Sequence, residues 1–417
     1  MERFQGLIGI VLILGVAFLF SNNKKRINYR LVLSGMALQL TIGILVLKVT
    51  PVTWFFKQLG KGMGKIEYFA KQGVNFAYNG VVAVDKTGHQ VNFSAPNTFV
   101  FAFSVTATII LVCILVAIFY HFGIMQRIVS IIAKAMNFIM KVSGAEALSN
   151  VASAFVGQVE AQVMIRPYLP TMTNSELLAS MSGSLACIAG GILIVYANMG
   201  AKAEYLLTAS IMAAPGALVI SKIVFPETEE SQTMGKVKLE VKSPYGNVID
   251  AISHGASDGM KISVNVIAML IGFIALISFV DWGLFKMGHI FSPSLNLSLN
   301  WIFGKLFYPF AWAMGVPTQD VANVATLLGQ KLTINEFVAF NNLTTKAIPV
   351  VSEKGLLIVS IAICGFANFS SVGMQIGGIG ELAPTRRADL AKLGLKALLC
   401  GTLASYLSAT LAGILMG

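Results

Sequence analysis

Long apolar runs, separated by short polar segments, dominate the pattern of hydrophobic and polar positions along this chain of 417 residues. A transmembrane helix needs about 20 predominantly apolar residues. The first run reaches that length only if its flanks contribute. The runs are Gly6–Phe20, Leu31–Val49, Thr98–Phe119, Leu177–Met199, Tyr205–Phe225, Val264–Val280, Leu356–Ile379 and Leu395–Leu415. The pattern predicts an all-α membrane protein with eight transmembrane helices.

Two further segments, Ala145–Leu169 and Asp320–Leu343, fit neither a lipid-facing helix nor a solvated loop. Both are moderately apolar, and each carries a Gly-Gln pair followed by a glutamate, Glu160 in the first and Glu336 in the second. Such backbone is tolerated at membrane depth only where it is buried in protein or lines a cavity. We predict that each segment forms a re-entrant helical hairpin.

The two hairpin segments and the spans that follow them repeat each other. Val156-Gly157-Gln158 parallels Leu328-Gly329-Gln330, and each following span is interrupted, at Ala189-Gly190-Gly191 and between Gly365 and Ser371. Three predicted spans separate the hairpins, so the repeat is inverted. Identity within it is low, and chance similarity is the alternative. Inverted repeats with broken helices are typical of secondary transporters, whose site lies near the bilayer midplane.

Composition supports lipid as the main solvent, because only 12% of the residues are charged and 56% are hydrophobic. Soluble domains carry about 25% charged residues. The net charge of +11 does not indicate nucleic-acid binding, since the basic residues lie at the ends of apolar runs rather than beside base-stacking aromatics.

The distribution of basic residues predicts the orientation in the membrane. If both termini lie outside, six of the seven arginines lie on the cytoplasmic side of the membrane. We predict that this membrane is a bacterial inner membrane. The lysine-containing segment Trp54–Phe76 then forms an external amphipathic helix in the interface. The polar segment Pro226–Lys242 forms a cytoplasmic linker.

Motifs for ATP hydrolysis and for enzyme catalysis are missing from the sequence. It contains no Walker loop, Ser-His-Asp set or HExxH motif, so we expect no catalytic residues and no enzyme. The four cysteines form no CxxC pair, which argues against a disulfide framework and a zinc site. We expect no tightly bound cofactor, and transport that is passive or coupled to an ion.

Glu160 and Glu336 are the main candidates for function, because a carboxylate at membrane depth is costly and usually functional. A structural ion pair is the alternative, with Arg166 as a partner for Glu160. Gln158 supplies two donors and an acceptor near the first hairpin tip. The broken span Phe366–Ser371 adds an aromatic face, an amide and hydroxyls, although core packing is the alternative for Phe366.

Three strings resemble the concentrative nucleoside transporter family over nearly the whole chain. Val156–Ala161 with Ile165–Leu169 is similar to the first hairpin, Lys331–Ala339 to the second, and Cys364–Ser371 to the broken seventh span. The resemblance implies nucleoside:cation symport by alternating access in a homotrimer. It also implies a scaffold part (1–125 and 227–317) and a moving transport part (126–226 and 318–417).

The resemblance also assigns roles to individual residues. Gln158 and Glu160 would contact the base, and Ile192 would line its pocket. The ribose hydroxyls would be held by Glu336, Asn368 and Ser371, with Phe366 packed against the nucleoside. Members of the family often have Thr or Ser at Val159, so the base preference stays open.

The sodium site of the family resembles Ser153 and Cys187 together with the carbonyls of Val156 and Ile188. Na⁺-coupled members commonly carry Asn and Ser at the first two positions, and a thiol is a poor ligand for a hard cation. Coupling to Na⁺ or to H⁺ therefore stays open. The alternatives are a carrier for another polar solute, such as a nucleobase or amino acid, and a channel or scaffold subunit.

Overall fold

Helices form almost all of the chain that the computed structural model describes, which comprises residues 2–77, 82–84, 90–92, 101–234, 245–292 and 296–416. This agrees with the predicted all-α fold. A short hairpin is an addition to it, in which β1 (Val82–Val84) pairs antiparallel with β2 (Gln90–Asn92). Residues 98–100 of the third predicted span and 235–242 of the predicted linker lie outside the described residues.

The first part of the chain contains the first three predicted spans. Its elements are α1 (Glu2–Leu19), η1 (Lys24–Arg26), α2 (Tyr29–Lys48), α3 (Thr50–Ala77), α4 (Phe101–His121) and α5 (Ile124–Met140). The predicted amphipathic segment lies within α3. The sequence pattern does not predict α5, which follows α4 after a bend of 75°.

The first hairpin segment and the broken span behind it follow. The elements are α6 (Gly144–Ser153), α7 (Glu160–Val163), η2 (Leu169–Thr171), α8 (Asn174–Ala186), α9 (Gly190–Asn198) and α10 (Ala203–Val224). Capping boxes begin both α6 and α8, with Ser143 and Thr173 as the N-caps. The chain leaves helical geometry between α8 and α9, where Ala189-Gly190-Gly191 predicts the interruption.

The second hairpin and the second broken span have the same order. The elements are α14 (Val321–Thr333), α15 (Glu336–Thr344), α16 (Glu353–Ile363), α17 (Phe369–Leu382), η3 (Pro384–Arg386) and α18 (Arg387–Met416). Asn335 caps α15 and Asn368 caps α17, each accepting a backbone N–H with its side chain. The interruption between α16 and α17 comprises residues 364–368, so it overlaps the predicted Gly365–Ser371 segment, whose last three residues already belong to α17.

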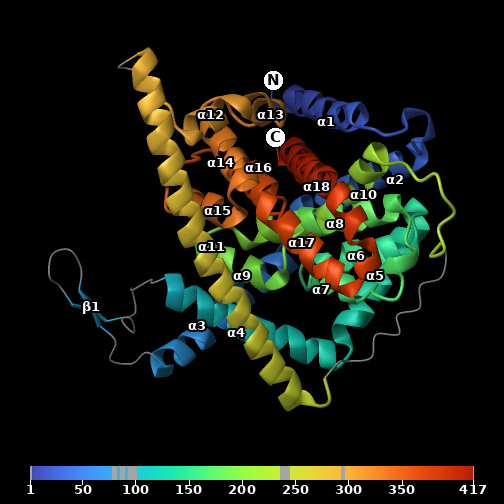
Figure 1. Ribbon diagram of the computed structural model, residues 1–417, viewed down its shortest axis with the longest axis horizontal. Helices are drawn as coiled ribbons and strands as arrows, with labels where there is room; N and C mark the ends of the chain where they lie inside the picture. Colours follow the sequence, from blue (N-terminus) through green and yellow to red (C-terminus); the bar gives the residue numbers. More distant parts are fainter. Residues whose placement is uncertain are drawn as a thin grey trace.

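A single helix of 44 residues, α11 (Val248–Phe291), connects the two halves and is much longer than the predicted span Val264–Val280. It runs along one side of the molecule (Figure 1) and packs on α4. A side chain at Gly255 or Gly259 would collide with the α4 backbone, so this Gly-xxx-Gly pair permits the close approach. The short helices α12 (Leu299–Leu306) and α13 (Tyr308–Ala313) follow α11.

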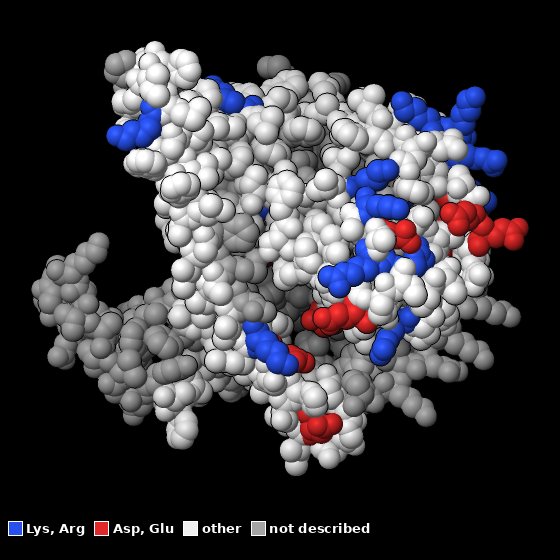
Figure 2. Space-filling view, in the orientation of Figure 1, with Lys and Arg blue, Asp and Glu red and all other residues white. Residues whose placement is uncertain are grey.

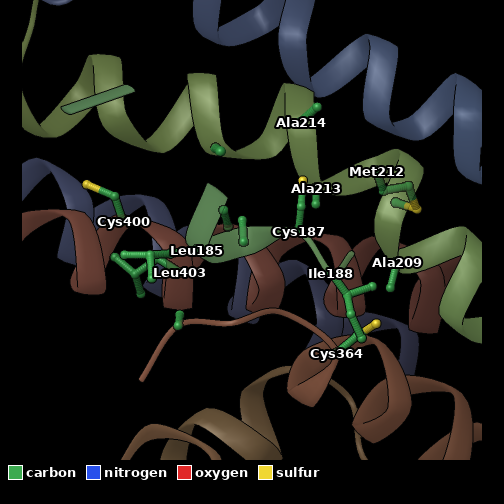
Figure 3. Close-up of a cluster of buried hydrophobic side chains, with 14 of the residues drawn as sticks. Leu185, Cys187, Ile188, Ala209, Met212, Ala213, Ala214, Cys364, Cys400 and Leu403 are labelled. Atoms are coloured by element: carbon green, nitrogen blue, oxygen red, sulfur yellow. The ribbon is translucent and has the colours of Figure 1, made fainter. Parts of the chain in front are cut away.

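The two interruptions meet in the core. Cys187 and Ile188 lie beside Cys364 and the α10 residue Ala209, and Leu185 faces Leu403 of α18 (Figure 3). All of these side chains are buried. The backbone N–H of Phe366 donates to the carbonyl of Cys187 at 3.2 Å, which joins one interruption to the other.

Five helices among the described residues are long and apolar enough to cross a membrane, or six if the bent pair of α4 and α5 is one span. The chain therefore has membrane-spanning helices, whereas the number eight stays a prediction. Much of the surface over α11 and α14 is free of charged side chains, which gather on the side of α2 and α5 (Figure 2). An uncharged face of this kind suits contact with lipid.

Candidate functional site

A cavity of about 220 Å³ brings together the eight predicted substrate residues, which come from both hairpins and both broken spans. No predicted substrate residue lies away from it. These residues are Gln158, Val159, Glu160, Ile192, Glu336, Phe366, Asn368 and Ser371. Segments that are far apart in the sequence thus meet because the two interruptions cross in the core.

The tip of the first hairpin presents Gln158, Val159 and Glu160 to the cavity. Gly157 has φ = +123°, a conformation that L side chains rarely adopt. An added Cβ at this position would also lie 2.5 Å from Oε2 of Glu160. Glycine at 157 therefore both permits the turn and leaves room for the carboxylate, whose side chain faces the open cavity.

Glu336 is held rigidly at the start of α15 by groups from two other elements. Tyr196 of α9 donates its hydroxyl to Oε1 at 3.1 Å, and Asn368 Nδ2 donates to Oε2 at 2.8 Å. Tyr196 is itself buried and stacks on Phe340, with ring centroids 4.5 Å apart. The carboxylate is thereby pre-oriented before any ligand arrives.

Asn368 both caps a helix and contacts Glu336 in the cavity. Its Oδ1 accepts the backbone N–H of Ser371 at 2.8 Å, which starts α17, while its Nδ2 holds Glu336. A helix N-cap typically uses the side-chain oxygen in this way. The cap therefore fixes the direction of the amide group that contacts Glu336.

Several cavity residues escape the sequence reasoning. Tyr196 lies in a predicted span, where the sequence pattern indicates a residue of the hydrophobic core. Only its hydrogen bond to Glu336 in the structure shows that it belongs to the cavity. Asn335 directly precedes Glu336 and could have been found on that ground. The remaining lining residues come from α4, from α11 and from positions that neighbour the predicted ones: Val105, Ile109, Val156, Gly157, Ala189, Val195, Ile262, Phe337 and Met374.

Lys331 on α14 is a further residue close to Glu336 whose position the sequence pattern does not indicate. Its side chain is fully buried, and its Nζ has no hydrogen-bond partner among the described residues. The charges of Lys331 and Glu336 act on each other. A buried ammonium therefore offsets part of the negative charge that Glu336 brings into the protein.

The predicted sodium-site residues lie where α6 and α8 end. The Ser153 hydroxyl bonds to the carbonyl of Ser149 at 2.7 Å and to the hydroxyl of Ser184 at 2.7 Å. Gln162 in turn donates to Ser184 at 2.8 Å. The only side-chain oxygen of the predicted set is therefore already engaged in a buried network.

The other three members of that set differ in surroundings. Cys187 and Ile188 sit in the apolar cluster of Figure 3, and the Cys187 thiol lies 3.8 Å from the carbonyl of Asn150. Val156 lines the 220 Å³ cavity. The ligands that this set presents to a cation are therefore mainly backbone carbonyl oxygens.

A second cavity, of about 320 Å³, adjoins the first and shares six lining residues with it: Ile109, Val156, Glu160, Ala189, Ile192 and Ile262. It extends between α4 and α11 to Tyr120, Tyr245 and Asp258, close to the start of α11. The two cavities together extend from Glu336 to the start of α11.

Family models match most of the chain. They describe a "Na+ dependent nucleoside transporter N-terminus" over residues 8–81, "Nucleoside recognition" over 102–203 and a "Na+ dependent nucleoside transporter C-terminus" over 205–413.

Relatives that match nearly the whole of this chain agree with these family models. Nucleoside permease NupC of Helicobacter pylori is 35% identical over 98% of this chain and 97% of its own. Sodium/nucleoside cotransporter 1 of Homo sapiens is 35% identical over 99% of this chain and 64% of its own. CNTnw, solved in an inward-facing substrate-bound state, is 36% identical with a TM-score of 0.90 over 100% of both chains. These relatives are transporters and not enzymes, and the chain belongs to the concentrative nucleoside transporter family.

Proposed function

We propose that this protein takes up nucleosides across a bacterial inner membrane by cation-coupled alternating access. The observation that carries the proposal is the single cavity in which a base-reading pair from one hairpin faces a carboxylate–amide pair from the other. A nucleoside has the same two-ended chemistry, with a polar base edge and a vicinal diol joined by a short apolar body.

The sugar end of the proposed site is built around Glu336. Hydrogen bonds to an ionised acceptor are roughly twice as strong as neutral ones. Asn368 and Ser371 stand beside the carboxylate as further hydrogen-bonding groups. This set favours a ribose diol over a solute that lacks adjacent hydroxyls.

The base end of the proposed site is less polar. Gln158 and Glu160 supply the hydrogen-bonding groups, whereas Val159 and Ile192 offer apolar contacts. Phe366 lines the cavity and is only partly buried, so its ring is available to pack on a ligand. Aromatic side chains bind bases in this way without strong sequence preference.

For the coupling ion we favour H⁺. The Ser153 hydroxyl is engaged with Ser149 and Ser184, and Cys187 contributes a thiol where a hard cation needs oxygen. Glu160 is the carboxylate that can take up the coupling proton, because its carbonyl oxygen still accepts a hydrogen bond when the group is protonated, whereas Glu336 stays ionised to hold the ribose. Na⁺ is the alternative, supported by the names of the family models and by the human relative.

We further propose a homotrimer with both termini outside the cell. Gly6 near one terminus packs against Ile414 near the other, which supports an even number of crossings. The moving part would comprise 126–226 and 318–417, carried against the scaffold formed by 1–125 and 227–317. Mass measurement in detergent and labelling of cysteines placed at either terminus check these two points.

Competition for uptake tests the proposed substrate. In proteoliposomes, unlabelled nucleosides should suppress uptake of labelled uridine, whereas free nucleobases and 2′,3′-dideoxy nucleosides should compete poorly. A carrier of nucleobases or amino acids would show the opposite order. Equal competition by free bases would reject the ribose assignment.

A further inference from the structure

Behind the base-reading residue Gln158 lies a second glutamine, Gln375 of α17, which does not line the cavity. Its side chain is fully buried. Its Nε2 donates to the backbone carbonyl of Met181 at 3.3 Å and to Oε1 of Gln158 at 3.5 Å. One amide NH₂ group thus uses its two hydrogens to join α8 to the first hairpin.

This chain of contacts has a fixed direction. A backbone carbonyl can only accept, so Met181 requires the NH₂ group of Gln375 on its side. The same NH₂ group requires an acceptor from Gln158, which turns the Gln158 oxygen away from the cavity. Turning the Gln375 amide over would place its oxygen against the Met181 carbonyl and lose both hydrogen bonds, and turning the Gln158 amide over would face two NH₂ groups toward each other.

The Gln158 NH₂ group is consequently the part of that amide available to a ligand. Its only hydrogen-bonding neighbour among the described residues is the Met374 sulfur at 3.9 Å. A thioether is a weak acceptor. Met374 itself lines the cavity, so a stronger acceptor on a bound base can take its place.

We propose that Gln375 is a positioning residue that makes Gln158 a donor, and that the site thereby selects bases carrying a carbonyl at that edge. The inference rests on the proposed function. Uridine and inosine carry a carbonyl where cytidine and adenosine carry an amine of nearly the same shape. The direction of the hydrogen bond is therefore the main difference on which the site can act. Glu160 beside Gln158 is an acceptor for the ring N–H that accompanies such a carbonyl.

The test compares uptake of uridine with cytidine, and of inosine with adenosine, in proteoliposomes. In the wild-type protein each carbonyl-bearing nucleoside should be preferred by about tenfold, the effect of one hydrogen bond of ordinary strength. Gln375→Leu removes the fixed direction, so both ratios should fall toward one. Gln375→Met, which conserves volume and lacks a donor, should behave in the same way.

A chemically matched control exists on α2. Gln39 is also fully buried, its Nε2 also donates to a backbone carbonyl (Met212, 2.9 Å), and its Oε1 also has no partner among the described residues. Gln39→Leu should change stability and leave both ratios unchanged. A wild-type preference for the amine-bearing nucleosides, or ratios that persist in both Gln375 variants, would overturn the inference.

The outcome also separates this inference from the proposed function. Uptake that depends on the ribose hydroxyls, with base ratios unaffected by residue 375, rejects only the role of Gln375. Absence of uptake for all four nucleosides in wild-type protein rejects the proposed function and this inference together.

Discussion

At Glu336 each carboxylate oxygen already accepts one hydrogen bond from the protein, from Tyr196 at one oxygen and from Asn368 at the other. An ionised carboxylate has about four acceptor positions. About two positions therefore remain for a ligand, which matches the two hydroxyls of a ribose. The protein contacts orient the group and still leave it able to bind.

Glu336→Gln tests this assignment. The amide has one oxygen instead of two, so its NH₂ group would face a donor from Tyr196 or Asn368. We expect uridine uptake to fall about 100-fold, as for the loss of a charged hydrogen bond of ~3 kcal/mol, with folding retained. Transport assays with purified protein and size-exclusion profiles measure both. Glu353→Gln, an exposed glutamate at the start of α16, is the control, and near-normal uptake by Glu336→Gln would remove Glu336 from the site.

Phe366→Ala distinguishes ligand stacking from core packing. If the ring packs on the nucleoside, affinity should fall by about 1–3 kcal/mol with little change in melting temperature. Phe303→Ala is a matched control, because Phe303 is buried on α12 away from the cavity. That variant should lose about 3–5 kcal/mol of stability and keep its affinity. The reverse behaviour of Phe366→Ala would restore the core-packing interpretation.

Sequence reasoning reaches the site residues that are unusual for their surroundings. Glu160 and Glu336 stand out because charge is rare in apolar segments, and the family resemblance supplies Ile192, which no local pattern indicates. Tyr196 and Gln375 stay hidden, since a single polar group in a helical pattern is also typical of ordinary packing. Their importance depends on hydrogen-bond partners more than 100 residues away in the sequence, at Glu336 and Gln158.

Among the elements, the two interruptions depend on close backbone contact. A Cβ at Gly365 would collide with the carbonyl of Ala186. Gly365→Ala should therefore push the interruptions apart, break the bond from Phe366 to Cys187 and abolish uptake. Gly373→Ala on α17 is the control, because an added Cβ meets nothing within 4 Å there. Uptake assays on both variants test whether the close contact at Gly365 is needed for transport. Full activity of Gly365→Ala would show that the contact is dispensable.

The linker end of the first hairpin is held by a buried ion pair. Lys222 of α10 lies 2.7 Å from Glu146 of α6, and both side chains are almost fully buried. Lys222→Met leaves Glu146 without its main partner and should cost about 3–5 kcal/mol. Thermal unfolding in detergent measures the loss.

The double variant Glu146→Gln with Lys222→Met supplies the control for that pair. It removes both charges and should recover much of the lost stability. A double variant as unstable as Lys222→Met alone would contradict the account, because the damage would then come from lost packing.

The elements show where periodicity suffices and where it does not. Both interruptions can be predicted from the glycine and polar residues that stand inside apolar runs. The hairpins can be predicted because their segments are too polar for lipid and too apolar for water. The length of α11 does not follow, because Val248–Ile262 is too polar to be recognised as a span and is held as helix by packing on α4. The bend between α4 and α5 likewise depends on Gly123, in a left-handed conformation with φ = +71°.

For the whole molecule, the position of the cavity is consistent with alternating access. Its walls come from the hairpins and broken spans on one side and from α4 and α11 on the other, through Val105, Ile109 and Ile262. Movement of one set of walls past the other would expose the ligand to either face. The division into scaffold and transport parts stays a prediction that distance measurements between labelled helices can check.

Accumulation of labelled uridine in proteoliposomes, with H⁺ and Na⁺ gradients imposed separately, shows whether the protein couples nucleoside uptake to a cation gradient. We expect uptake above the equilibrium level when an inward H⁺ gradient is present, and a fall to that level when a protonophore is added. Accumulation under Na⁺ alone would keep the nucleoside symporter and replace the proposed ion. Uridine that merely equilibrates under both gradients, or does not enter at all, would contradict the account.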